Sequence, residues 1–190
     1  MTLKFGTSGV RGLVTEMTDL ECYLFSRAFA IYVKYKFEVK EVSIAGDYRT
    51  STPRIIKAVI SGIKDENLKI DYCGYIPTPA LVYISMLKKN AGIMVTGSHI
   101  PDDRNGIKFN LPDGEILKCD EKNILEEYNK LKFQNDPYII KKFDSSGNLL
   151  NKDNITEKIN KEAEIQYMKR YSDNFEQGCL SGYKIVVYQH

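Results

Sequence analysis

One stretch of the chain brings together a hydroxyl, an imidazole and an ammonium group among several glycines. An apolar run at residues 92–95 is followed by Ser98 and His99 in a loop, and Lys108 comes a little further along. The glycines let the backbone turn tightly around the serine hydroxyl. Backbone N–H groups and a nearby ammonium group stabilise a phosphate. The stretch therefore predicts a serine that receives or donates a charged group, and phosphate is the first candidate.

The same serine does not fit a hydrolase. A nucleophile elbow, G-x-S-x-G, has a glycine on each side of the serine, whereas Thr96 and Ile100 occupy those positions here. Besides His99 the only histidine is His190, the last residue, so the sequence offers no second internal histidine as the base of a triad. The sequence therefore disfavours a serine hydrolase.

A second candidate phosphate contact lies near the amino terminus. Residues 5–12 read Phe-Gly-Thr-Ser-Gly-Val-Arg-Gly, a glycine-rich turn with the hydroxyls of Thr7 and Ser8 and the guanidinium of Arg11. A guanidinium can bind a phosphate through two parallel hydrogen bonds. The glycine spacing matches neither a Walker loop nor G-x-G-x-x-G, so a simple turn remains an alternative.

Two further turns follow predicted strands. Residues 46–52, Gly-Asp-Tyr-Arg-Thr-Ser-Thr, place Arg49 between a strand and a helix. Taken alone, such an arginine is more often a solvated surface charge. Residues 74–79, Gly-Tyr-Ile-Pro-Thr-Pro, predict a rigid turn from strand to helix.

Together the four segments resemble the α-D-phosphohexomutases, the phosphomannomutase/phosphoglucomutase family. The phosphoserine loop of that family is written T-A-S-H-N-P followed by N-G-x-K. Residues 5–12 resemble its F-G-T-S-G-x-R-G, residues 46–52 resemble G-x-D-x-R-x-S with the glycine one place closer to the aspartate, and residues 74–79 match G-x-x-P-T-P. The resemblance covers most of residues 1 to about 135. The positions that match the phosphoserine loop are Thr96, Ser98, His99, Pro101, Asn105, Gly106 and Lys108.

The loop departs from the family pattern at two positions. Gly97 stands where alanine is common, and we expect this change between small residues to matter little. Ile100 stands where asparagine is usual, which puts one loop-stabilising hydrogen bond in doubt but not the nucleophile.

The resemblance implies a reversible mutase that moves phosphate between the 1- and 6-hydroxyls of a hexose phosphate. A phosphorylated Ser98 would donate its phosphate to the sugar, giving a hexose 1,6-bisphosphate, which is also the implied activator. The phosphate on Ser98 would supply an oxygen ligand to Mg²⁺. Lys108, with His99 beside it, would offset charge or assist proton transfer. The residues implied to position the loop or the phosphate are Thr7, Ser8, Arg11, Arg49 and Asn105.

Other parts of the family's active site are not encoded in these 190 residues. The metal loop D-G-D-x-D-R is absent, so the main Mg²⁺ ligands would lie outside this chain, as would two substrate-binding loops. We therefore expect an amino-terminal piece of a larger mutase that is inactive alone. A non-enzymatic phosphate-binding or protein-interaction module derived from the same fold is the alternative. The serine in F-G-T-S-G disfavours the glucosamine branch, and mannose is preferred to glucose as the substrate sugar.

Composition excludes several other classes of protein. Hydrophobic residues make up 43% and charged residues 27% of the chain, as in an ordinary globular protein. The formal net charge of +2 is too balanced for nucleic-acid binding to be expected. The sequence has no apolar run of the roughly 18 residues that a membrane span needs, and its polar start is no signal peptide. The cysteines are widely spaced, which favours reduced thiols and a cytoplasmic location.

Strand and helix patterns alternate through the first two thirds of the chain. Thr18 and Glu21 predict a capping box at the start of an amphipathic helix, and Thr52 and Asp120 are expected to cap two later helices. The order predicts an α/β fold with a mixed, mainly parallel sheet and helices on both faces, of the phosphoglucomutase first-domain type. Ser98 would lie just beyond the carboxyl end of a strand, where open α/β sheets bind ligands. Strands are expected at 42–45, 68–73, 92–95, 107–109 and 115–117.

We expect one complete domain, residues 1–135, followed by a connection at residues 136–155 with one strand at 138–143. Residues 156–190 would begin an incomplete second α/β domain, with a helix followed by a strand at 183–188. Because this strand lacks partners in the chain, we expect the second part to be loosely held, or to self-associate through its exposed edge.

Overall fold

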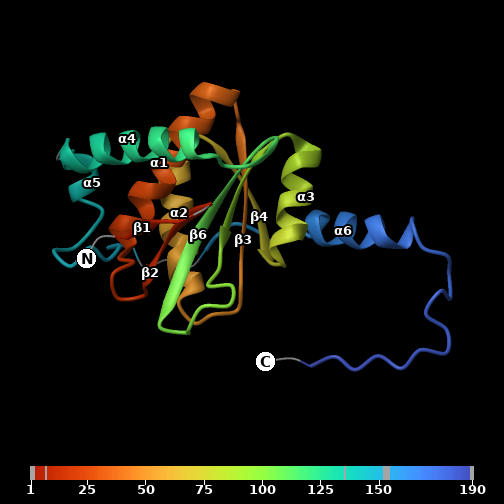
Figure 1. The fold of residues 1–190 in the computed structure, drawn as a ribbon. Coiled ribbons are helices and arrows are strands. Elements are labelled where there is room, and N and C mark those ends of the chain that lie inside the picture. Colours follow the sequence, from red (N-terminus) through yellow and green to blue (C-terminus); the bar gives the residue numbers. More distant parts are fainter. Residues whose placement is uncertain (1–2, 7, 135, 152–154, 189–190) are drawn as a thin grey trace.

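The computed structural model describes residues 3–6, 8–134, 136–151 and 155–188. Within these residues, strands and helices alternate and build one seven-stranded sheet between two layers of helices (Figure 1). The strands are β1 (Lys4–Phe5), β2 (Gly9–Leu13), β3 (Glu41–Gly46), β4 (Lys69–Tyr75), β5 (Ala91–Val95), β6 (Arg104–Leu111) and β7 (Gly114–Glu115). The helices are α1 (Asp19–Phe37), α2 (Thr52–Asp65), α3 (Thr78–Lys88), α4 (Lys118–Phe133), α5 (Pro137–Ile140) and α6 (Glu162–Ser172).

The sheet is mixed, as predicted, but less of it is parallel than the sequence suggested. Its order is β1-β2-β6-β5-β3-β4, and β7 pairs with β6. The pairs β5–β3 and β3–β4 are parallel, whereas the pairs formed by β1, β2, β6 and β7 are antiparallel. The connections explain this difference, because a helix separates the parallel strands and a loop without a helix joins β5 to β6. The glycine-rich segment near the amino terminus, read as a turn, contributes the extra antiparallel strand β2.

Helices cover both faces of the sheet, as predicted. The larger apolar core lies on one face and contains side chains of α1, α2 and α4. A smaller cluster on the other face joins the sheet to α3, and Ala163 of α6 belongs to it. Figure 1 shows α3 and α6 on the side of the sheet away from α1, α2 and α4.

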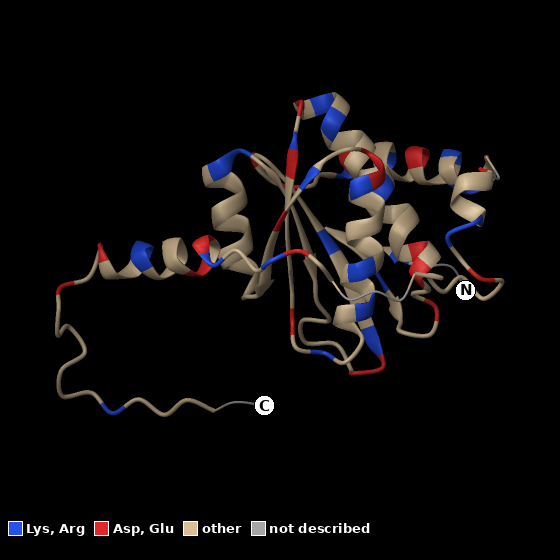
Figure 2. Cartoon of the chain, turned by 180° about the vertical axis from the view of Figure 1, so that it is seen from behind, with Lys and Arg blue, Asp and Glu red and all other residues tan. Residues whose placement is uncertain are grey.

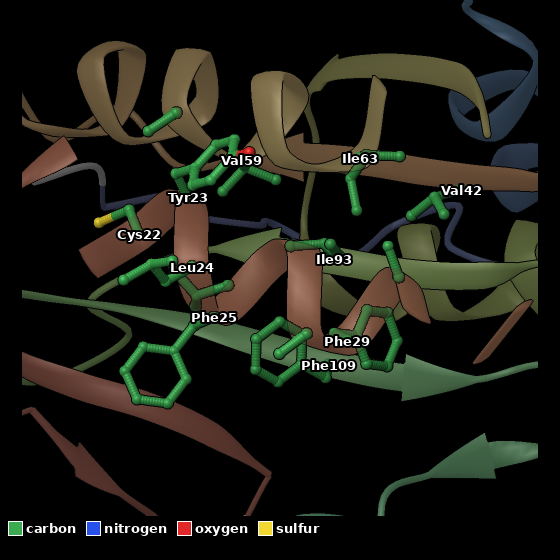
Figure 3. Packing of buried hydrophobic residues seen from close by; sticks show 14 of the residues in the cluster. Cys22, Tyr23, Leu24, Phe25, Phe29, Val42, Val59, Ile63, Ile93 and Phe109 are labelled. Atoms are coloured by element: carbon green, nitrogen blue, oxygen red, sulfur yellow. The ribbon is translucent and has the colours of Figure 1, made fainter. Parts of the chain in front are cut away.

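Aromatic rings anchor the larger core around α1. Phe29 stacks on Phe109 of β6 with ring centroids 4.6 Å apart, and Phe25 stacks on Tyr128 of α4 at 4.0 Å. All four side chains are buried, and Figure 3 shows Phe25, Phe29 and Phe109 among the packed aliphatic side chains. Burying one such side chain contributes about 1.5–3 kcal/mol. These contacts hold α1 against β6, the strand that also carries Lys108.

The capping box predicted for α1 is only half formed. The Glu21 N–H donates to Thr18 Oγ1 at 3.2 Å, so Thr18 caps the helix as expected. The Glu21 carboxylate accepts hydrogen bonds from the Tyr128 hydroxyl at 2.5 Å and from the Lys132 ammonium at 2.7 Å. This carboxylate therefore ties α1 to α4 as well as occupying the first turn of its own helix.

The connection after α4 contains a helix where a strand was predicted. Pro137 occupies the first turn of α5, and the Asp136 carboxylate accepts a hydrogen bond from the Tyr138 N–H at 2.9 Å. Proline at the first helical position and aspartate before it both favour a helix start. These local preferences override the strand pattern of residues 138–143, and Phe143 forms only an isolated bridge with Leu149.

The helix expected from residue 156 begins later, at Glu162, because the preceding segment runs along the free edge of β4. The Asn160 N–H donates to the Tyr72 carbonyl oxygen at 2.7 Å. The Asn160 side-chain amide donates to the buried Asp71 carboxylate, also at 2.7 Å. The prediction that this part is loosely held was therefore wrong for the start of α6.

The chain beyond α6 does not form the predicted strand. Residues 183–188 are exposed and have no strand partner within the described part of the chain. Figure 1 shows the segment after α6 as extended chain away from the sheet. A single strand cannot satisfy its backbone hydrogen bonds without a neighbour. The strand edge that suggested self-association is therefore not formed.

Basic and acidic residues are interspersed along the described chain and occur in helices, strands and loops (Figure 2). Helices α1, α4 and α6 have acidic residues in their first turns and basic residues in their last turns, which complements the helix dipole. Among the described helices, none combines the length and the apolar character needed to cross a membrane.

Asp120 connects α4 to α1 through a buried carboxylate. It lies in the first turn of α4 rather than at the N-cap, and its carboxylate caps the helix by accepting a hydrogen bond from the Leu117 N–H at 2.7 Å. The same carboxylate accepts hydrogen bonds from the Lys36 ammonium at 2.8 Å and from the Tyr32 hydroxyl. Burial disfavours the charged form, but the bonds from Lys36 and Tyr32 outweigh burial and lower the pKa of Asp120.

We expect Asp120→Asn to lower the free energy of unfolding at pH 7 by about 1–3 kcal/mol, since the buried Tyr32 hydroxyl and the Lys36 ammonium lose a charged acceptor. A carboxylate whose pKa falls on folding stabilises the protein above its unfolded pKa of about 3.9, and this stabilisation disappears as the pH drops through the folded pKa. The difference between the two proteins should therefore shrink at pH 3. Urea denaturation at pH 7 and pH 3 measures it, and an equal difference at both values contradicts a role for the charge.

Candidate functional site

Ser98 lies on a loop beyond the carboxyl end of β5, where α/β sheets bind their ligands. Its φ is +51°, a left-handed conformation that costs a non-glycine residue about 1–3 kcal/mol. The Ser98 N–H donates to Thr96 Oγ1 at 2.9 Å, which closes a tight turn, and the serine side chain is exposed. The surrounding structure therefore has to hold an exposed hydroxyl in an unfavourable backbone conformation.

Asp47 holds the beginning of this loop. β3 and β5 are parallel neighbours, so Asp47, which follows β3, lies beside the end of β5. One carboxylate oxygen accepts from the Gly97 N–H at 2.9 Å, and the other accepts from the Thr52 hydroxyl at 2.6 Å and the Arg49 N–H at 3.1 Å. Burial opposes the charge of Asp47, but these hydrogen bonds outweigh it and lower the pKa. Sequence analysis did not single out Asp47, although its place in the G-x-D-x-R-x-S segment was a signal.

Arg49 holds the middle of the loop. Its guanidinium donates to four backbone carbonyl oxygens of the loop and of the start of β6. The distances are 3.3 Å to Ser98, 2.5 Å to Ile100, 2.8 Å to Pro101 and 3.1 Å to Arg104. The side chain is only 15% exposed, so Arg49 is not the solvated surface charge that its sequence context alone favoured.

Asn105 holds the end of the loop from a completely buried position. Its oxygen accepts from the Gly106 N–H at 2.8 Å, and its nitrogen donates to the Ser51 hydroxyl at 2.8 Å and the Thr52 hydroxyl at 3.1 Å. We call residues 47–52 the clamp segment, because Asp47, Arg49 and Ser51–Thr52 bind the beginning, middle and end of the serine loop.

The serine loop borders a pocket with a volume of about 160 Å³. In the pairing of β2 with β6, Gly9 lies opposite Lys108 and Arg11 opposite Gly106. Opposed residues of an antiparallel pair project from the same face of the sheet, so Arg11 and Lys108 approach the pocket from that face. The charged, imidazole and hydroxyl side chains around the pocket include Ser8, Arg11, Ser98, His99 and Lys108.

The structure brings five of the predicted site residues together at the pocket, whereas Arg49 holds the serine loop without bordering the pocket. Ser98 Oγ and His99 Nδ1 are 3.4 Å apart, at the long end of hydrogen-bond distance. Asn105 does not border the pocket, since its side chain is used entirely by Gly106 and the clamp segment. The predicted residue Thr7 lies outside the described residues.

The described residues do not form a complete magnesium site. Within the described ranges, no group of three or more His, Cys, Asp or Glu residues could hold a metal ion. Near the serine loop, the Asp47 carboxylate already accepts hydrogen bonds from Gly97 and Thr52. Asp102 is 96% exposed and pairs with Arg49 at 3.3 Å. Mg²⁺ requires about six oxygen ligands in near-octahedral geometry. The residues present do not by themselves fit the ion.

The mixed sheet, the helices on both faces and the serine loop at the carboxyl edge define an α/β domain of phosphohexomutase type. The family model described as phosphoglucomutase/phosphomannomutase, alpha/beta/alpha domain I, matches residues 2–135. The chain belongs to this family. A solved structure of a phosphoglucomutase/phosphomannomutase family protein from Burkholderia thailandensis is similar with a TM-score of 0.61 and 25% identity, covering 68% of this chain and 30% of that one.

Curated relatives show the same affiliation over nearly the whole chain. A phosphomannomutase from Salmonella muenchen is 37% identical over 188 residues, which is 99% of this chain and 36% of the relative. A phosphomannomutase from Sinorhizobium fredii is 35% identical over 98% of this chain and 38% of the relative. A phosphoglucosamine mutase from Thermosipho africanus is 33% identical over 96% of this chain and 38% of the relative. The chain thus spans a little over a third of the length of these relatives.

We expect Asn105→Ala to lower the free energy of unfolding by about 1–3 kcal/mol, because it leaves the Gly106 N–H without its acceptor in a buried position. Asn105→Asp keeps that acceptor, but it buries a carboxylate and places an acceptor oxygen against the Thr52 hydroxyl, which already donates to Asp47, so it should cost at least as much. Thermal denaturation of both variants measures the effect. Equal melting temperatures for wild type and Asn105→Ala contradict the structural role.

Proposed function

We propose that this chain carries the phosphate-accepting serine of a phosphohexomutase that interconverts hexose 1-phosphate and hexose 6-phosphate. The observation that carries the proposal is the position of Ser98: its exposed hydroxyl stands in a strained loop, on a pocket that two cations, Arg11 and Lys108, also line. Family membership supports the reaction class. The activity belongs to a longer protein, since the relatives are more than twice as long as this chain.

Each residue around the pocket has its own role in the proposed phosphoryl transfer. The bond between phosphorus and Ser98 Oγ breaks as a sugar oxygen bonds to phosphorus, and the proton that the sugar hydroxyl loses is balanced by one gained at Ser98 Oγ. The hexose 1,6-bisphosphate then returns its other phosphate to Ser98. Lys108 offsets charge on the transferred phosphate, with His99 positioned beside the serine. Arg11 and Ser8 bind the phosphate, and Arg49 positions the loop.

The remaining parts of the site are assigned to residues outside this chain. The phosphate on Ser98 would give Mg²⁺ one oxygen ligand, and the described residues offer no other set for it. We therefore infer that the 190-residue chain alone does not turn over hexose phosphates. Its cysteines, free within the described residues, fit the proposed cytoplasmic location.

The proposed sugar is mannose or glucose rather than glucosamine. Relatives named phosphomannomutase cover slightly more of this chain than a relative named phosphoglucosamine mutase. Steady-state assays of the longer protein with mannose 1-phosphate, glucose 1-phosphate and glucosamine 1-phosphate decide among the three substrates.

We expect label from a hexose bisphosphate, added to the full-length protein, to appear on the peptide that contains Ser98. Ser98→Ala should abolish the labelling, whereas Ser146→Ala should retain it, because Ser146 is exposed and does not border the pocket. Mass spectrometry of the digested protein locates the phosphate. Label that persists in Ser98→Ala contradicts the assignment, and a wild type without label favours a non-enzymatic module.

Lys108→Ala in the full-length protein should lower kcat by about 10²–10³-fold, because a charge aimed at the transferred phosphate acts mainly in the transition state. The fold should survive, since Lys108 is only partly buried and lies on a strand paired on both sides. Exposed Lys122→Ala on α4 is the matched control. An unchanged kcat in Lys108→Ala shows that this lysine is only a surface charge.

A further inference from the structure

A second hollow adjoins the serine pocket. It has a volume of about 240 Å³, and the residues that border it are Arg11, Gly12, Ile100, Pro101 and Arg104. Arg11 and Ile100 also border the serine pocket, so the two hollows lie side by side. We call the second one the arginine hollow, because two of the residues around it are arginines.

The strand register explains why two guanidinium groups meet there. In the pairing of β2 with β6, Arg11 lies opposite Gly106. Arg104 comes two residues before Gly106, and Lys108 comes two residues after it. Alternate residues of a strand project from the same face, so these three cations share one face of the sheet. Diagonal neighbours across an antiparallel pair are about 7–8 Å apart, within reach of long side chains. Arg11 therefore stands between Lys108 at the serine pocket and Arg104 at the arginine hollow.

The two guanidinium groups of the arginine hollow have no partner within the described part of the chain. Both side chains are exposed, and neither forms a hydrogen bond or an ion pair there. The other four arginines each bind a carboxylate or lie over an aromatic ring: Arg27, Arg49, Arg54 and Arg170. The exposed carboxylates of Asp102 and Asp103 do not border the arginine hollow. Neighbouring like charges repel each other, and an anion between them replaces repulsion by attraction. The arrangement is therefore typical of an anion-binding site.

The backbone fixes Arg104 relative to Ser98. The Arg104 carbonyl oxygen accepts a hydrogen bond from the Arg49 guanidinium at 3.1 Å, and the same guanidinium donates to the Ser98 carbonyl oxygen at 3.3 Å. The Arg104 N–H donates to the Pro101 carbonyl oxygen at 3.0 Å. An anion bound in the arginine hollow would thus lie at a defined position beside the serine.

We propose that Arg11 and Arg104 form a second phosphate subsite, which retains the hexose 1,6-bisphosphate while its two phosphates exchange places at Ser98. The inference rests on the proposed function, in which the bisphosphate must turn round between the two transfers. A guanidinium binds a phosphate through two parallel hydrogen bonds, and one phosphate can lie at each hollow.

Retention of the bisphosphate has a chemical consequence. A bisphosphate that escapes carries both phosphates away, so Ser98 is left as a free hydroxyl. The enzyme then stops until a further bisphosphate transfers one phosphate to Ser98 Oγ, and the sugar oxygen that loses this phosphate takes up the serine proton. A weaker second subsite should therefore raise the amount of bisphosphate activator that the enzyme needs.

Arg104→Gln in the full-length protein tests the inference by activity. We expect the bisphosphate concentration that gives half of the maximal rate to rise about tenfold, because one charged hydrogen-bonding group is lost. At saturating bisphosphate kcat should change less than about threefold, since Ser98 and Lys108 remain in place. Arg104→Lys keeps the charge but not the planar fork, so its effect should be smaller. Lys122→Gln on α4 is the matched control, because it removes an exposed charge that borders neither hollow.

Calorimetry provides a readout that does not need mutase activity. In a Ser98→Ala background no phosphate is transferred, so unchanged ligands can be titrated with and without Arg104→Gln. We expect Arg104→Gln to weaken the binding of glucose 1,6-bisphosphate about tenfold and that of glucose 1-phosphate less than about twofold. The melting temperature should stay at the wild-type value, because the side chain is exposed and unpaired within the described residues.

The outcomes separate this inference from the proposed function. Unchanged affinity for the bisphosphate in Arg104→Gln overturns the inference, and so does an equal loss of affinity for bisphosphate and monophosphate, which indicates only a general charge effect. If the wild-type protein has no mutase activity, the proposed function fails, and calorimetry still decides whether Arg104 binds a second phosphate.

Discussion

The site depends on the partly buried carboxylate of Asp47. It binds the Gly97 N–H of the serine loop, and it also binds Thr52 and Arg49 of its own segment. A buried charge is costly unless hydrogen bonds compensate it, and here those bonds go to the two segments that must stay together. Through Arg49 the same carboxylate influences the backbone on both sides of Ser98. The strain at Ser98 is therefore balanced by interactions outside the serine loop itself.

The topology of the sheet makes this arrangement possible. Parallel pairing of β3 with β5 places the clamp segment beside the serine loop, because both follow the carboxyl ends of their strands. β6 runs antiparallel to β5, which places Lys108 beside β5. β2 pairs with the other edge of β6 and carries Arg11. Gly9 allows β2 to come this close, since a Cβ atom there would lie 2.0 Å from the Ile107 carbonyl oxygen. The parallel strands thus position the serine loop, and the antiparallel strands carry the cations Arg11 and Lys108.

Features that depend on neighbouring residues could be predicted from the sequence, and those that depend on distant partners could not. Thr18 was identified as a helix cap from local spacing, but the attachment of the Glu21 carboxylate to Tyr128 needs the packed helices. The strand at residues 138–143 was wrong because Pro137 starts a helix there. Ser98 and Lys108 were found through their motif, whereas Asp47 acts through Gly97, and only the sheet order shows that these residues meet.

The cations of the pocket come from one side only. Arg11 and Lys108 lie on the strands beneath the serine loop, and Asp47 and Arg49 are committed to holding the loop. Phosphoryl transfer develops charge on all the oxygens of the transferred group, and its stabilisation is strongest where water is excluded. An open pocket of this size on the edge of a sheet cannot surround a hexose phosphate. The proposed phosphoryl transfer would therefore need a second set of groups facing Ser98, in addition to the residues that line this pocket.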